Sequence, residues 1–176
     1  MLERLLNTPE DPVLTIVRVV LGVVMFAHGA QKMLGWFGGY GFRGTMGFFR
    51  EQLKIPSVFA FLAIMAEFFG SIGLILGLFT RIAALGIAIV MLAAIFMVHL
   101  RVGFFSNWFG NQKGEGFEYH LLAIALCIVL LARGAGAFSL GHMLYQRVSS
   151  PEARQSIGVQ SPLVSSRGNR SDGQRR

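Results

Sequence analysis

The chain has 176 residues, of which 53% are hydrophobic and only 14% charged, whereas soluble domains carry roughly a quarter charged residues. This composition excludes an ordinary soluble domain, and the single cysteine, Cys127, excludes an intramolecular disulfide and paired-thiol chemistry. The net charge of +7 does not indicate nucleic-acid binding, because seven of the sixteen basic residues lie from Arg133 onward. We therefore expect an integral membrane protein with the lipid bilayer as its main partner and no nucleic-acid partner.

Four apolar runs are long enough to cross a hydrocarbon core of about 30 Å, and they cover residues 12–34, 56–79, 81–100 and 117–140. The fourth is the weakest, because it reaches full length only by including the segment GAGAFSLG. The first run lacks a basic start and is interrupted by Arg18, so we interpret it as a retained helix and not as a signal peptide. The predicted fold is an all-α membrane protein, a bundle of four transmembrane helices.

The start of the first predicted helix is marked by the sequence TPED. We expect Thr8 to cap this helix, with Pro9 in the first turn and acidic residues near the positive helix end. Thr80 is predicted to cap the third helix in the same way. Residues 1–11 are thus interpreted as a short N-terminal cap segment before the membrane domain.

The long connection after the first run predicts a further helix. Apolar residues recur there at steps of four, three and four, as Phe42, Met46, Phe49 and Leu53. This stripe is typical of a short interfacial helix that lies on the membrane surface between the first and second spans. Trp36 and Phe37, just before it, are interpreted as residues of an aromatic belt, with Lys32 as an interfacial anchor.

The second and third predicted spans are joined by residues 78–81 alone, so they must form an antiparallel hairpin. Small residues, among them Gly70, Gly73 and Gly86, favour close packing of these two helices in lipid. The third connection, residues 101–116, is polar and aromatic, with Trp108 suited to the interfacial belt. Both long connections are expected on the same side of the membrane.

Lys and Arg are distributed unevenly between the two sides, with nine on the side of the termini and the short hairpin and six on the side of the long connections. This distribution favours termini in the cytoplasm. We divide the chain into residues 1–11, a membrane domain of residues 12–141, and a basic, disordered cytoplasmic tail of residues 142–176.

Two ionisable residues fall deep within the predicted spans. At about 1.5 Å per residue, Arg18 and Glu67 differ in height by only some 5 Å, so an ion pair between them is geometrically plausible. A charge near the middle of a bilayer costs about 2.5 to 3.5 kcal/mol on insertion scales. Glu67 therefore either ties two helices together through Arg18 or lines a polar cavity.

Further polar residues gather at the loop side of the bundle, and His28, Gln31, His99 and Glu118 are the candidates to share a cavity with Glu67. Gln31 lies on the same helix face as His28. Glu118 and His120 point to different sides of their helix, so at most one of them should face a given site. Each of these residues can also be interpreted as an ordinary interfacial or structural side chain without a role in binding.

The sequence offers no catalytic motif and no metal-binding motif. Neither Glu67 nor Glu118 is followed three residues later by a histidine, as a di-iron bundle requires, although His28 and His99 could almost supply a pair of haem ligands. A proton or ion path would need polar residues at successive depths, and the third span has almost none inside. We therefore expect no intrinsic catalytic residue and no metal.

Three stretches resemble the DoxX family of small bacterial inner-membrane proteins: RVVLGVVMFAHGAQKMLGWFGG, the run from IPSVF to FMVH, and GFEYHLLAIALCIVLLARGAGAFSLG. The resemblance implies a four-helix membrane bundle and a link to membrane redox chemistry, since the proteins that give the family its name are subunits of a thiosulfate:quinone oxidoreductase. Family members usually carry an Asp after the final Ser-Leu, where this chain has Gly141 followed by His142.

Two functional hypotheses follow from the sequence. The first is an accessory subunit of a quinone-linked membrane redox system, with Glu67 and His28 in a cavity that binds quinone and with an oxidoreductase as partner. The second is a non-catalytic scaffold or small transporter in which Arg18 and Glu67 form a structural pair.

Overall fold

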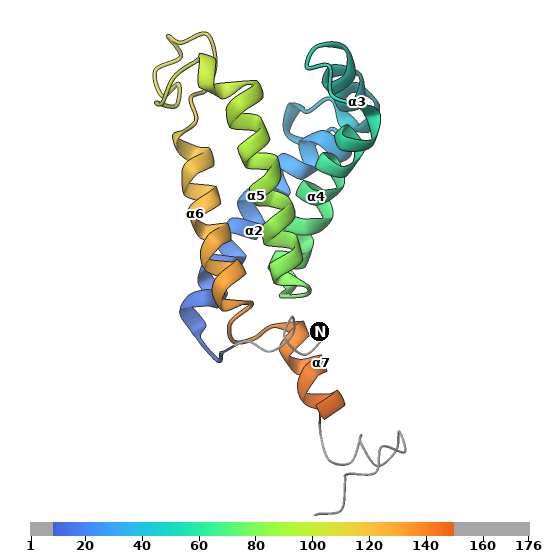
Figure 1. Cartoon of the computed structure of the whole chain (residues 1–176), viewed down its shortest axis with the longest axis vertical. Coiled ribbons are helices and arrows are strands. Elements are labelled where there is room, and N and C mark those ends of the chain that lie inside the picture. The colour runs from blue at the N-terminus through green and yellow to red at the C-terminus, as the bar shows by residue number, and fades with distance from the viewer. Residues whose placement is uncertain (1–8, 150–176) are drawn as a thin grey trace, which may run out of the picture.

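A computed structural model describes residues 9–149 of the chain, and every regular element in this range is helical (Figure 1). The helices are α2 (Pro12–Met33), α3 (Gly41–Glu51), α4 (Ser57–Leu76), α5 (Thr80–Met97), α6 (Glu118–Arg133) and α7 (Leu140–Ser149), with 3₁₀ turns η1 (Trp36–Gly38) and η2 (His99–Arg101). Three of them, α2, α4 and α5, are long and apolar enough to cross a membrane. The predicted all-α membrane protein is confirmed.

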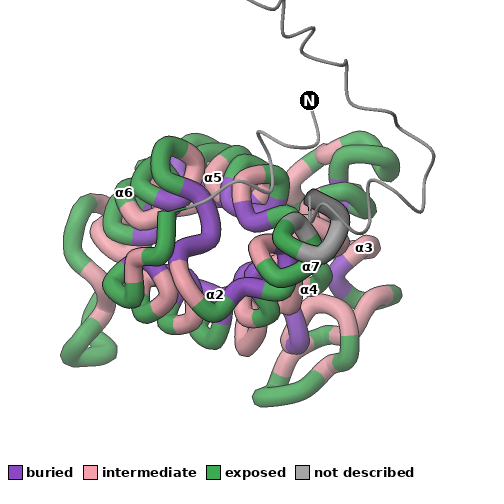
Figure 2. Tube along the Cα trace, turned by 90° about the horizontal axis from the view of Figure 1, so that it is seen from below, coloured by how far each residue is buried: buried purple, intermediate pink, exposed green. Residues whose placement is uncertain are grey.

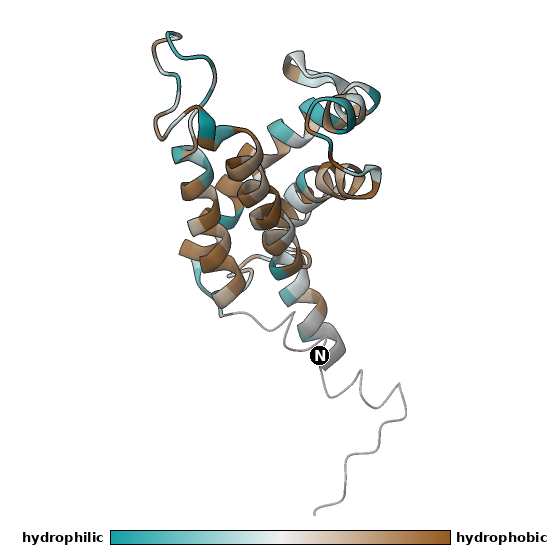
Figure 3. Ribbon diagram, turned by 45° about the horizontal axis from the view of Figure 1, so that its top comes forward, coloured by the Kyte–Doolittle hydropathy of each residue, from teal (hydrophilic) through white to brown (hydrophobic). Residues whose placement is uncertain are grey.

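The bundle is formed by α2, α4, α5 and α6. Helix α2 packs mainly on α4, and α5 packs on both α4 and α6. The shared core includes Leu21, Met25, Leu74, Ile87 and Leu130, which face inward, while exposed residues cover the outside of the bundle (Figure 2). Much of that outer surface is apolar (Figure 3), as expected where helices face lipid.

The two ends of the bundle differ in construction. Helix α3 and the residues 102–117 lie together at one end, here named the loop end, and α7 lies at the opposite end (Figure 1). The two long connections thus emerge at the same end of the bundle, as the expectation of a common side of the membrane requires. The predicted stripe forms the helix α3 as far as Phe49, whereas Leu53 lies beyond its end at Glu51. The Phe42 ring meets that of Phe61 on α4 edge to face at 6.3 Å.

The start of α2 follows the predicted chemistry with a different capping residue. The Asp11 carboxylate accepts a hydrogen bond from Val13 N at 2.8 Å, and Pro12 occupies the first turn. The predicted cap Thr8 lies outside the described residues. For α5 the predicted cap is wrong: Phe79, with a φ of 49°, makes the tight turn, so Thr80 is already inside the helix and its buried hydroxyl has no partner among the described residues.

The predicted end of the fourth span is also wrong. Helix α6 stops at Arg133 after 16 residues, about 24 Å, because Gly134 and Gly136 adopt positive φ angles. A Cβ on Gly136 would lie 2.7 Å from Asp11 O, so residues 134–139 pass directly against the start of α2. Helix α7 then crosses the predicted domain boundary at Gly141, and the predicted disordered tail is helical up to residue 149; its remainder lies outside the described residues.

The predicted hairpin of α4 and α5 is confirmed, with small residues at its contact. A Cβ on Gly86 would lie 3.2 Å from Ala66 Cβ, and one on Gly70 would lie 3.6 Å from the Ile87 side chain. These contacts hold the two helices together as far as the middle of each helix. Toward the loop end the helices diverge, with α4 leading to α3 and α5 to η2 (Figure 1).

Candidate functional site

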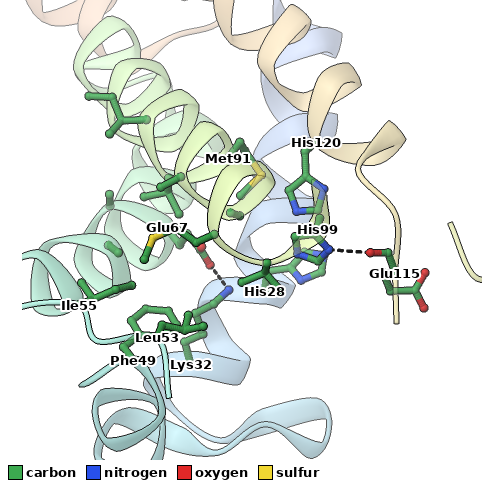
Figure 4. Close-up of a pocket in the computed structure, with 18 of the residues that line it drawn as sticks. His28, Lys32, Phe49, Leu53, Ile55, Glu67, Met91, His99, Glu115 and His120 are labelled. Atoms are coloured by element: carbon green, nitrogen blue, oxygen red, sulfur yellow. Dashed lines mark hydrogen bonds and ion pairs between the residues drawn. The ribbon is translucent and has the colours of Figure 1, made fainter. Parts of the chain in front are cut away.

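A cavity of about 1340 Å³ lies at the loop end of the bundle, and we refer to it as the loop-end cavity. It is bordered by helices α2 to α6 and by the loop before α6 (Figure 4). Its wall is mainly apolar. The ionisable residues of this lining, apart from Lys54 after α3, are His28 and Lys32 from α2, Glu67 from α4, His99 from η2, Glu115 from the loop, and Tyr119 and His120 from α6.

The deepest charged group of the cavity is Glu67, which is 2% exposed and forms a salt bridge with the Lys32 ammonium (Figure 4). Gly29 allows this contact, because a Cβ there would lie 2.7 Å from the Phe68 backbone; only glycine lets α2 come so close to α4. A carboxylate removed from water is stable only with such a partner. The interpretation of Lys32 as a simple interfacial anchor is therefore wrong.

The predicted ion pair between Arg18 and Glu67 is not formed. Arg18 is 1% exposed and donates hydrogen bonds to backbone carbonyls, at 2.6 Å to Leu74 O and Ile75 O, 3.0 Å to Ala135 O and 3.2 Å to Phe138 O. The carbonyls of α4 belong to its last turn, where the Gly77 N–H reaches Leu74 O and a cation is favoured near the helix end. The interpretation of Arg18 and Glu67 as one structural pair, on which the scaffold alternative rests, is contradicted.

His28 lies one helical turn before Lys32 and faces the same cavity. Its ring contacts the ring of Tyr119 at 5.5 Å between centroids, and the Tyr119 hydroxyl donates to the sulfur of Met25 at 3.3 Å. Residues four apart share a helix face, so the spacing of His28 and Lys32 was a usable signal in the sequence. The cavity thus places an imidazole beside the buried ion pair.

A pair of imidazoles closes the loop end of the cavity. The rings of His99 and His120 are 4.1 Å apart, and His99 Nδ1 donates to the carbonyl of Glu115 at 2.8 Å, since a carbonyl only accepts (Figure 4). His120 is 7% exposed, and its Nδ1 has no hydrogen-bond partner among the described residues. This end of the cavity has unused hydrogen-bonding capacity.

Two of the predicted cavity residues lie outside the lining. Gln31 donates from Nε2 to Phe37 O at 3.3 Å and so supports the turn after α2. Glu118 accepts hydrogen bonds from Ser106 N at 2.9 Å and from the Trp108 indole at 3.0 Å, which organise the loop before α6 and favour the ionised carboxylate. His120, and not Glu118, faces the cavity, in agreement with the expectation that at most one of them would.

Of the five predicted site residues, the structure therefore brings His28, Glu67 and His99 to one cavity. Lys32, Glu115, Tyr119 and His120 also line the cavity but are not among the predicted site residues. The spacing to His28 could have identified Lys32, whereas Glu115 depends on the course of an irregular loop that carries no periodic signal. Residues 9–149 contain no group of three or more side chains placed to hold a metal ion.

Fold and cavity together define a small helical membrane protein with a polar site inside its bundle. The chain belongs to the DoxX family, whose sequence model matches residues 13–100. It is 30% identical over 115 residues to the Bacillus subtilis protein named "Putative oxidoreductase CatD", which covers 65% of this chain and 75% of the relative. It is also 30% identical over 157 residues to "Uncharacterized membrane protein Rv3486" of Mycobacterium tuberculosis, which covers 86% of this chain and 93% of the relative. No solved structure matches it significantly.

Proposed function

We propose that this protein is a quinone-binding accessory subunit of a membrane oxidoreductase in the bacterial inner membrane. The observation that carries the proposal is the buried Glu67–Lys32 pair beside His28 in the wall of a largely apolar cavity. A buried ionisable residue in a membrane helix is expensive, and such residues generally mark a site of ligand or proton binding. Membership of the DoxX family and the name of the Bacillus subtilis relative support a redox setting.

The polar residues of the cavity suit both the oxidised and the reduced form of a quinone. A quinone supplies two-electron chemistry coupled to the uptake or release of two protons at its carbonyl oxygens. The Lys32 ammonium can donate a hydrogen bond to a carbonyl oxygen, and the Glu67 carboxylate can accept one from a hydroxyl. His28 can do either, depending on its protonation, so these three side chains can bind both redox forms and exchange protons with them.

The size of the cavity is consistent with this class of ligand. Small-molecule sites usually enclose about 300–1,000 Å³ and combine an apolar wall with few polar groups. The loop-end cavity, at about 1340 Å³, has this chemistry and more than this volume. A quinone ring with part of its apolar tail fits such a space better than a compact polar metabolite does.

We further propose that α6 crosses the membrane as a fourth span, with α3 lying at the interface and both chain termini in the cytoplasm. With 16 residues α6 measures about 24 Å, somewhat less than the hydrocarbon core, and Arg133 at its end can reach the headgroups. In this topology the loop end faces away from the cytoplasm. The oxidoreductase partner would then meet the quinone site from that side or from within the bilayer.

The decisive test is the substitution Glu67→Gln, which keeps the shape of the side chain and removes its charge. We expect binding of decylubiquinone, measured by quenching of tryptophan fluorescence in nanodiscs, to weaken about tenfold or more, because a hydrogen bond to a charged group contributes about 1.5–3 kcal/mol. Glu51→Gln is the matched control, since Glu51 ends α3 at the same end of the bundle, is exposed and lies outside the cavity lining. Its quinone affinity should remain within about twofold of the wild type.

Purification in mild detergent supplies a second readout. Organic extraction should recover quinone from the wild type and less from Glu67→Gln, and proteins that copurify should include an oxidoreductase. A wild-type protein that binds no quinone, or a Glu67→Gln variant with unchanged affinity, would contradict the proposal.

A further inference from the structure

The loop-end cavity has two chemically different sides. With the exception of Glu67, the helices α4 and α5 contribute apolar or small residues to it. Its remaining ionisable groups come from α2, α6, η2, the segment after α3 and the loop before α6. A ligand that matches both sides must itself be divided, with a polar head toward α2 and α6 and an apolar part toward α4 and α5. This asymmetry fixes the orientation of the ligand within the cavity.

The gap between α4 and α5 is closed at the level of Glu67, here called its floor, and open toward the loop end. Ala66 and Gly86 come together at the floor, where the two helices are in close contact. From Gly86 to Met97, α5 lines the cavity along a stretch of 12 residues, about 16 Å of helix, while α4 lines it from Phe59 to Glu67. The diverging helices therefore enclose a groove that runs from the level of Glu67 toward the loop end.

This groove is continuous with the surface that faces lipid. Several of its lining residues are at the same time largely exposed on the outside of the bundle: Phe59 at 63%, Leu62 at 52% and Ile89 at 59%. These side chains border both the cavity and the outer surface, as the rim of a lateral opening between α4 and α5 would. In the membrane, the surroundings of these apolar side chains are lipid tails.

From this continuity we propose that α4 and α5 form a lateral portal, lined by Phe59, Leu62, Ala93 and Met97, through which the ligand enters from the bilayer and in which its apolar tail remains. The proposal rests on the proposed function in that it concerns the same cavity. It adds the class of ligand, a membrane-resident amphiphile with a small polar head at Glu67 and Lys32 and one long tail. It also adds the route of entry, which avoids the aqueous loop end.

The volume and the energetics agree with such a ligand. A free ring without a tail would leave much of the 1340 Å³ unfilled. A tail gains little by exchanging lipid for an apolar groove, because lipid is as apolar as the side chains. The portal therefore determines which molecules can enter, and the head groups determine how tightly they bind.

Blocking the portal tests this inference. Ala93 is exposed and lines the cavity, so the large side chain of Ala93→Trp should fill the groove. Leu92→Trp is the matched control: Leu92 is the neighbouring residue of α5, 49% exposed and outside the lining. Both variants are compared with the wild type in phosphatidylcholine nanodiscs.

The first measurement uses two quinones with the same head, decylubiquinone and the tailless 2,3-dimethoxy-5-methyl-1,4-benzoquinone, with concentrations expressed per bilayer volume. We expect Ala93→Trp to weaken decylubiquinone binding about tenfold, equivalent to about 1.4 kcal/mol, and to leave the tailless quinone within about twofold. Leu92→Trp should change neither. An unchanged affinity of Ala93→Trp for decylubiquinone, or an equal loss for both quinones, would overturn the portal.

The second measurement does not depend on quinone binding. A palmitic acid that carries a diazirine in the middle of its chain is irradiated in the nanodiscs, and the labelled residues are mapped by mass spectrometry. Met91 lines the cavity and is only 5% exposed, so a tail reaches it only through the portal. We expect labelling of Met91 in the wild type and Leu92→Trp, and its loss in Ala93→Trp. An unlabelled Met91 in the wild type overturns the portal, whereas failure of both quinones to bind, with Met91 labelled, contradicts only the proposed function.

Discussion

Two buried charges in this protein are almost equally hidden from solvent but very differently connected. Arg18 is 1% exposed and uses three guanidinium nitrogens to bind four backbone carbonyls at the end of the bundle opposite the loop end. Glu67 is 2% exposed and forms one salt bridge, to a lysine that is itself 26% exposed. Burial alone therefore does not distinguish a structural charge from a candidate binding group.

The difference lies in the remaining hydrogen-bonding capacity. The guanidinium of Arg18 uses four of its five N–H donors on carbonyls that are fixed in the backbone, so at most one donor is left for a ligand. A carboxylate offers about four acceptor positions, and Glu67 also borders a cavity large enough for a second molecule. We expect substitutions at the Arg18 region to affect stability, and those at the Glu67 region to affect binding more than stability.

The largest effect is expected for Arg18→Leu. Removing the guanidinium leaves the carbonyls of Ile75, Ala135 and Phe138 without the Arg18 donor, and several such unsatisfied acceptors together should lower the free energy of unfolding by about 3–5 kcal/mol. Thermal unfolding in detergent, followed by circular dichroism, measures this loss. A variant as stable as the wild type would contradict the structural role of Arg18.

A smaller loss of stability is expected where α2 and α4 are in closest contact. In Gly29→Ala the new methyl group meets the backbone of Phe68, which cannot move aside, so overpacking should cost about 1–3 kcal/mol and weaken quinone binding as Lys32 moves away from Glu67. Gly47→Ala is the control, because nothing lies within 4 Å of that position on α3. Its stability should be unchanged or higher by up to about 1 kcal/mol.

Two double-mutant cycles sharpen the comparison further. The cycle of Lys32→Met with Glu67→Gln should give a coupling energy of about 1 kcal/mol, because the two side chains are in direct contact. The cycle of Arg18→Met with Glu67→Gln should give a coupling within about 0.5 kcal/mol of zero, as for independent sites. A large coupling between Arg18 and Glu67 would show that the two regions are not separate. Unfolding free energies of the single and double variants provide both values.

The fold could be predicted from the sequence to the extent that it depends on apolar length and small residues. The first three spans follow from runs of about 20 apolar residues, and the hairpin of α4 and α5 follows from a connection too short for any other arrangement. The end of α6 could not be predicted in this way. It depends on the positive φ angles of Gly134 and Gly136 and on a contact with Asp11, more than 120 residues away in the chain.

The candidate site could be predicted only in part, for a similar reason. His28, Glu67 and His99 were identified because an ionisable residue in or near an apolar run is unusual by itself. Their partners could not be predicted, because the position of a residue along a helix gives its depth in the membrane but not the direction of its side chain around the helix axis. Arg18 and Glu67 have similar predicted depths and yet bind different partners. Lys32 reaches Glu67 only because Gly29 brings the two helices together.

The bonding of Arg18 also determines when the bundle can be completed during synthesis. Its carbonyl partners on α4 come 56 and 57 residues later in the chain, and those after α6 come 117 and 120 residues later. Helix α2 therefore leaves the ribosome as a segment with an uncompensated cation, at a cost of up to about 2.5–3.5 kcal/mol on insertion scales. The last of these acceptors arrives only after α6 has been made. The C-terminal third of the chain is therefore needed to complete the assembly of the bundle. In a nascent chain truncated before residue 134, Arg18 of α2 would lack two of its four carbonyl partners.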